Sequence, residues 1–100
     1  MLAFVSIAPE DHWEHMSPEI APLVQKIERS GLAYELGPMG TTVEGEPEAV
    51  FELLKELHLF MRGRSRRVST LIKIDDQVDR PPGRIKEKVE SVRRRMADQT

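Results

Sequence analysis

Alternation between apolar and polar positions predicts four strands in this chain. Residues 2–7 are apolar at every position except one, which is typical of a central strand with both faces covered. Residues 67–75 alternate between apolar and polar side chains and predict a second long strand. Two short β-prone stretches, 33–36 and 41–45, flank Gly37-Pro38-Met39-Gly40, a turn sequence that predicts a hairpin.

Helical spacing of apolar residues marks three further segments. The first starts at Ser17-Pro18 and is closed by Gly31, and the second runs from Pro47 to about Gly63. The third follows the break at Pro81-Pro82-Gly83. The order is β-α-β-β-α-β-α, which predicts an α+β fold of the ferredoxin-like, split βαβ type with an extra C-terminal helix. Residues 1–100 make a single domain.

A ferredoxin-like sheet carries its helices on one face only, so the other face needs a cover. Residues 2–7 have no polar side, and Leu71 alternates with the core-facing residues of its strand. Because a large apolar face rarely stays in water, we expect this open sheet face to form a homodimer or homotetramer. A second possibility is that the last helix covers part of it.

Composition narrows the classes of function. The 100 residues include no cysteine, which excludes disulfide scaffolds, thiol nucleophiles and thiolate metal sites and fits a reducing compartment. No apolar run approaches the length of a membrane span, and no cationic segment precedes residues 2–8, so we expect a cytoplasmic protein without a membrane partner.

The net charge is −2, divided into −7 for residues 1–50 and +5 for residues 51–100. This asymmetry fits a basic face in the second half of the sequence that binds phosphate or nucleic acid. It fits equally an electrostatic attraction between the two halves of one chain or between subunits of an oligomer.

The loop Asp11-His12-Trp13-Glu14-His15 offers imidazoles and carboxylates that could bind a divalent metal. The spacing lacks the helical scaffold of a His-Glu-x-x-His site, so we interpret the loop as solvated and expect no metal. Trp13 could instead shield a pocket or an interface.

Two arginine-rich stretches, 62–67 and 93–95, could contact phosphates. Arg62 and Arg64 also follow a helix C-terminus, where cations stabilise the helix dipole without any ligand. Sheet-based RNA readers stack bases on strand aromatics, and the two long strands offer only Phe4. We therefore expect no nucleic acid partner.

Polar side chains on the predicted strands are the third candidate site. Thr41, Thr42 and Glu44 lie on one strand of the hairpin, and Ser6, Lys73 and Asp75 lie on the two long strands. These groups could converge on a polar ligand, and a Glu44–Lys73 ion pair on a solvated face explains them equally well. No nucleophile motif, phosphate loop or dinucleotide fingerprint is present, so we expect no enzyme. Acid–base chemistry by Asp75, Asp76 and the histidines is the remaining catalytic alternative.

Two stretches, Ser30–Gly45 and Arg67–Asp75, resemble the YkoF-like thiamine-binding family, and Lys88–Val92 also matches it. The resemblance implies a ferredoxin-like subunit that forms dimers or tetramers with packed sheets. It also implies non-catalytic binding of thiamine or its hydroxymethylpyrimidine portion, with no other cofactor. The Asp11–His15 loop departs from the small residues that the family usually has there.

Residue roles in such a site are our hypotheses. Glu44 would accept a hydrogen bond from the ligand's amino group or offset its positive charge. Thr41 and Thr42 would supply hydroxyls to ring nitrogens, while Tyr34, Met39 or Trp13 would pack on ring faces. The predicted ligand site comprises eight residues: Ser6, Tyr34, Met39, Thr41, Thr42, Glu44, Lys73 and Asp75. The alternative function is a structural or regulatory homo-oligomer with no small ligand.

Overall fold

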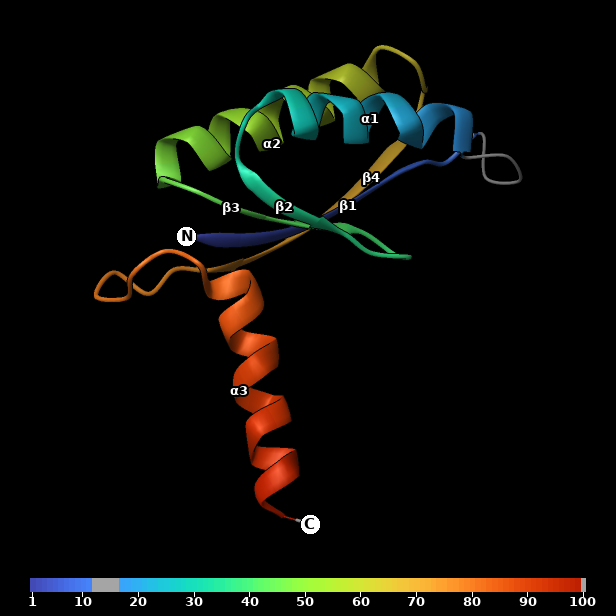
Figure 1. Cartoon of the computed structure of the whole chain (residues 1–100). Helices are drawn as coiled ribbons and strands as arrows, with labels where there is room; N and C mark the ends of the chain where they lie inside the picture. The colour runs from blue at the N-terminus through green and yellow to red at the C-terminus, as the bar shows by residue number, and fades with distance from the viewer. Residues whose placement is uncertain (12–16, 100) are drawn as a thin grey trace.

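A computed structural model of the protein describes residues 1–11 and 17–99 and contains one four-stranded antiparallel sheet (Figure 1). The strands lie in the order β2-β3-β1-β4, so β1 is central and is flanked by β3 and β4. In the register, Val5 lies opposite both Thr41 and Ile72. The strands are β1 (Leu2–Pro9), β2 (Ala33–Leu36), β3 (Thr41–Glu44) and β4 (Val68–Asp75).

Two helices, α1 (Ser17–Arg29) and α2 (Pro47–Arg62), cover one face of the sheet (Figure 1). Alternate residues of β1 face them, and Ala3, Val5 and Ile7 are buried in the core. The apolar stripe of α2 packs on the same core, where Leu57 and Met61 are almost fully buried. The α+β, ferredoxin-like split βαβ fold is therefore confirmed.

The third helix, α3 (Arg84–Asp98), stands away from the sheet on the side opposite α1 and α2 (Figure 1). None of its residues is buried, and its apolar stripe of Val89, Val92 and Met96 is exposed. The possibility that this helix covers part of the open sheet face therefore holds only for its first turn, which contacts β3, because the rest of α3 projects outwards instead of lying along the strands (Figure 1). Leu71 of β4 consequently remains 62% exposed on that face.

The turn between β2 and β3 approaches β1 closely. Gly37 donates its backbone N–H to the carbonyl of Gly40 at 2.9 Å, which closes the turn. A Cβ atom on Gly40 would lie 2.3 Å from Cζ of Phe4 and 2.8 Å from the carbonyl oxygen of Val5. Only glycine therefore fits at position 40, and this close approach fixes the turn beside β1.

Candidate functional site

A cavity of about 340 Å³ lies between α1 and the sheet, at the end where the β2–β3 turn closes over β1. Its volume falls within the range of small-molecule sites, roughly 300–1,000 Å³. Most of its walls are aliphatic side chains from the strands and from both core helices. The main ones are Val5, Ile7, Leu23, Ile27, Leu36 and Leu57.

Thr41 contributes a polar side chain to the lining of this mostly apolar cavity. It is the first residue of β3 and shares the helix-facing side of that strand with Val43, so it is only 5% exposed. Among the described residues its hydroxyl has no hydrogen-bond partner and is not fully enclosed, so it is available to a ligand in the cavity. Met39, 83% exposed, lies at the turn that borders the same cavity.

The described lining carries no charged side chain. Burying an ionised group against such walls is costly, because desolvation would not be offset by a partner. The cavity therefore suits a small, largely neutral molecule that can exchange a hydrogen bond with the Thr41 hydroxyl.

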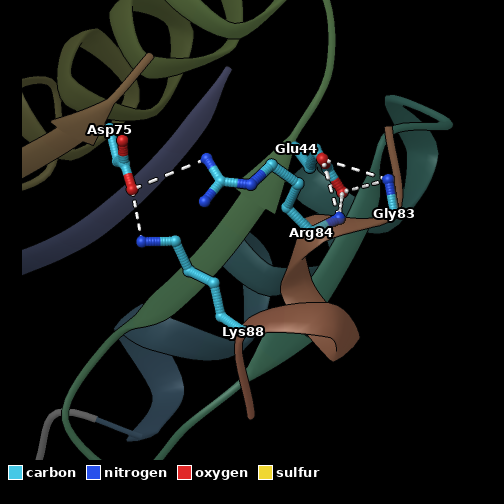
Figure 2. Close-up of polar contacts among 5 residues, drawn as sticks. All are labelled: Glu44, Asp75, Gly83, Arg84 and Lys88. Atoms are coloured by element: carbon cyan, nitrogen blue, oxygen red, sulfur yellow. Dashed lines mark hydrogen bonds and ion pairs between the residues drawn. The ribbon is translucent and has the colours of Figure 1, made fainter. Parts of the chain in front are cut away.

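A second, more polar cavity of about 470 Å³ lies near the C-terminal ends of β3 and β4 and the start of α3. Glu44, only 8% exposed, accepts hydrogen bonds there from the backbone N–H groups of Gly83 and Arg84 at 3.1–3.2 Å (Figure 2). Both carboxylate oxygens take part. The carboxylate that was predicted to accept a hydrogen bond from a ligand therefore accepts hydrogen bonds from the first turn of α3 instead. No ion pair joins Glu44 to Lys73 among the described residues.

Asp75 of β4 fixes the same helix from a second direction. It accepts a hydrogen bond from the ammonium of Lys88 and lies 3.7 Å from a guanidinium nitrogen of Arg84 (Figure 2). The hydrogen bond from Lys88 holds the pKa of Asp75 below its ordinary value. Desolvation raises this pKa, whereas the positive charges of Lys88, Arg84 and Lys73 lower it further. This corner of the molecule anchors α3.

The structure divides the eight predicted site residues among separate places. Ser6, Met39 and Thr41 border the first cavity, whereas Glu44 and Asp75 border the second. Ser6 lies opposite Leu71, so its side chain alternates to the open face and only its backbone faces the cavity. Tyr34, Thr42 and Lys73 line neither cavity. The hydroxyl of Tyr34 lies 3.5 Å from a carboxylate oxygen of Glu28.

The other candidates receive less support. The proposed ligands His12 and His15 lie outside the described residues, and the described ones contain no group of three or more metal-ligating side chains. In the arginine-rich stretch, Arg64 pairs with Glu19 at 2.6 Å and lies over the ring of Phe60 at 5.3 Å. No helix of the described chain has both the length and the hydrophobicity to cross a membrane.

The apolar walls of the first cavity were not predicted as a site. Apolar residues recur at helical spacing in α1, at Ile20, Leu23, Val24 and Ile27. This spacing predicts a helix face that points to the core, but it does not distinguish a filled core from one that contains a cavity. The one sequence signal that points to the cavity is the glycine-flanked turn before Thr41.

Comparisons with known proteins agree on one family. A family model described as thiamine-binding protein matches residues 3–93. A UPF0045 protein of Methanothermobacter thermautotrophicus is 34% identical over 83 residues, which cover 81% of this chain and 83% of that protein. Bacillus subtilis YqgV, also a UPF0045 protein, is 36% identical over 67 residues, 65% of this chain and 62% of that protein.

Solved structures show the same fold. A hypothetical protein of Methanocaldococcus jannaschii aligns with a TM-score of 0.82 and 26% identity over 91% of this chain and 93% of its own. A Thermotoga maritima protein, described as a candidate thiamine biosynthesis/salvage protein, aligns with a TM-score of 0.79 and 28% identity over 91% of this chain and 96% of its own.

Proposed function

Because this chain belongs to the thiamine-binding protein family, we propose that it is a non-catalytic binding protein for thiamine or its hydroxymethylpyrimidine portion. The Thermotoga maritima neighbour, described in terms of thiamine biosynthesis or salvage, supports the same ligand class. We infer the place of the ligand from the shape and lining of the first cavity.

The observation that carries the proposal is the apolar cavity bordered by the buried residue Thr41, whose hydroxyl has no hydrogen-bond partner among the described residues. An aminopyrimidine is planar, and its ring nitrogens and exocyclic amine donate and accept in the plane of the ring. Aliphatic walls would contact the ring faces, while Thr41 would exchange a hydrogen bond with a ring nitrogen or the amine. Met39 at the rim would contact the ring edge through its thioether.

The part of thiamine that carries the permanent charge belongs outside this cavity. The described lining offers no carboxylate to offset a thiazolium cation. We therefore propose that the pyrimidine enters and that the thiazolium stays at the solvent-facing rim. The same lining has no titratable side chain to activate the Thr41 hydroxyl as a nucleophile, which supports binding over catalysis.

Titration calorimetry with hydroxymethylpyrimidine and with thiamine tests this function. Thr41→Val keeps the shape but removes the hydroxyl, and we expect affinity for both molecules to fall roughly tenfold, the equivalent of about 1.4 kcal/mol. Thr42→Val is the matched control, since Thr42 is the next residue of β3 and lines neither cavity. Absence of heat with the parent protein, or equal losses in both variants, would contradict the proposal.

We also propose that the chain forms a homodimer or homotetramer through its open sheet face. Phe4 and Leu71 lie on that face, and Leu71 is 62% exposed with α3 pointing away. Leu71→Glu should lower the mass measured by light scattering, because a charge buried without a partner opposes association. A parent protein of 11.5 kDa in solution would contradict self-association.

A further inference from the structure

Met39 is an exposed thioether in a turn whose conformation does not require it. The residue is 83% exposed, although its side chain is long and apolar. Tight turns usually carry glycine, proline, asparagine, aspartate or serine, and Gly37, Pro38 and Gly40 already supply the residues that favour this turn. Packing in the core therefore gives no reason for a methionine at position 39.

This thioether lies at the mouth of the first cavity. Met39 is part of the cavity lining, and the buried residue Thr41, two positions further along, belongs to the same lining. The turn is held in place, because the backbone N–H of Gly37 binds the carbonyl of Gly40 and Gly40 packs against Phe4. The side chain of Met39 is thus open to solutes and adjacent to the apolar cavity.

Mild oxidation of this chain falls on thioethers, because the sequence contains five methionines and no cysteine. Among the described methionines, Met61 is fully buried in the core and Met1 is half-buried, whereas Met39 and Met96 are exposed. Met96 belongs to α3 and lines neither cavity. Met39 is therefore the exposed methionine of the described chain whose modification would alter the lining of a cavity.

We propose that Met39 is a reversible oxidation site that lowers the affinity of the first cavity for its ligand. The proposal rests on the function proposed above for this cavity. A lone pair of the sulfur attacks one oxygen of hydrogen peroxide, and the O–O bond breaks. The leaving hydroxide takes the proton of the transferred oxygen, so the products are methionine sulfoxide and water. Sulfur loses two electrons to the peroxide, and a thiol-dependent reductase returns two electrons and releases the oxygen as water.

The added oxygen changes the mouth of the cavity from apolar to polar. In the proposed complex the thioether of Met39 contacts the ring edge of the ligand. A bound ring would strip water from a sulfoxide oxygen at that place, against walls that are mainly aliphatic. We therefore expect affinity for hydroxymethylpyrimidine to fall roughly tenfold. Stability in urea should stay the same, since the Met39 side chain is mostly solvated.

Peptide mass spectrometry after brief treatment with hydrogen peroxide tests the site itself. Met39 and Met96 should each gain one oxygen atom, while the buried Met61 stays reduced and circular dichroism is unchanged. Saturating hydroxymethylpyrimidine should slow the oxidation of Met39 and leave the rate at Met96 as it was. A Met39 that does not react with peroxide would overturn the proposal.

Titration calorimetry before and after peroxide treatment measures the effect on affinity. The parent protein and the matched control Met96→Leu should each lose roughly tenfold in affinity. A methionine sulfoxide reductase with dithiothreitol should restore the affinity of both. Met39→Leu should lose no affinity on treatment, whatever its starting value, because leucine has no sulfur to oxidise. A loss that persists in Met39→Leu would overturn the proposal.

Failure of this proposal can be distinguished from failure of the ligand function. An untreated parent protein that gives no heat with hydroxymethylpyrimidine or thiamine contradicts the ligand function, and the regulation of that ligand fails with it. A parent protein that binds, and that binds equally well once mass spectrometry shows Met39 to be oxidised, contradicts the regulation alone.

Discussion

Both carboxylate oxygens of Glu44 lie 3.1 Å from the backbone nitrogen of Arg84, across 40 positions of sequence. The last residue of β3 thereby binds the first turn of α3, where unpaired N–H groups and the positive end of the helix dipole favour an anion. Gly83 adds its own N–H from a left-handed conformation with φ 95°. A helix without buried residues is thus fixed to the sheet at its first turn.

Glu44→Ala should destabilise the protein by about 1.5–3 kcal/mol, because charge-assisted hydrogen bonds to two backbone donors are lost. Urea unfolding measures the change. Affinity for hydroxymethylpyrimidine should stay the same, since Glu44 does not line the cavity beneath the β2–β3 turn. Glu35→Ala, an exposed carboxylate on the same sheet face, should change neither quantity. A tenfold loss of affinity without a loss of stability would instead return Glu44 to the ligand site.

The attachment of α3 should weaken in acid through Asp75. The hydrogen bond from Lys88 lowers the pKa of Asp75 in the folded chain, so its contribution is present above the unfolded pKa of about 4 and is lost as the pH falls through the lowered folded value. Carboxyl titration by NMR should show Lys88→Met raising this pKa towards the ordinary value. Asp75→Asn should remove the corresponding part of the acid sensitivity in unfolding experiments, and identical pH profiles would exclude the role.

Gly40→Ala should destabilise the protein by about 1–3 kcal/mol, because its new methyl group would overlap the ring of Phe4 and the carbonyl of Val5. Urea unfolding measures the loss, and Phe4→Leu in the same chain should restore part of it. Gly63→Ala is the control, since its Cβ would lie 3.4 Å from the nearest atom in an ordinary helical conformation with φ −75°. Equal effects at both glycines would argue against the close approach.

Local patterns explain why the fold could be predicted. Alternation, helical spacing and the turn sequence at residues 37–40 indicated the strands and helices of the described residues, with one sizeable boundary difference among them: β1 continues to Pro9. Ala8 and Pro9 lie beyond the strand predicted over residues 2–7, and they pair with Ser69 and Val68 at the end of the ladder.

The candidate site was harder to predict because it depends on distant contacts. Glu44 finds its partners at Gly83 and Arg84, which no spacing along the chain could indicate. Similarly, the stripe of α1 predicts a buried face but not the space left between that face and β1. Thr41 was predicted as a hydroxyl donor to a ligand, and its burial beside the cavity agrees with that role, which awaits the binding experiment.

Val24→Leu should test the cavity through stability and binding together. Val24 lines the space beneath the turn, so an added methylene has room and should stabilise the protein by about 0.5–1 kcal/mol. The same methylene would occupy part of the ligand's volume, so affinity for hydroxymethylpyrimidine should fall. Val50→Leu is the matched control, because Val50 is fully buried away from the cavity and its enlargement should destabilise by about 1–3 kcal/mol. Urea unfolding and calorimetry on both variants measure these effects, and a Val24→Leu protein that loses stability would show that the space is already filled.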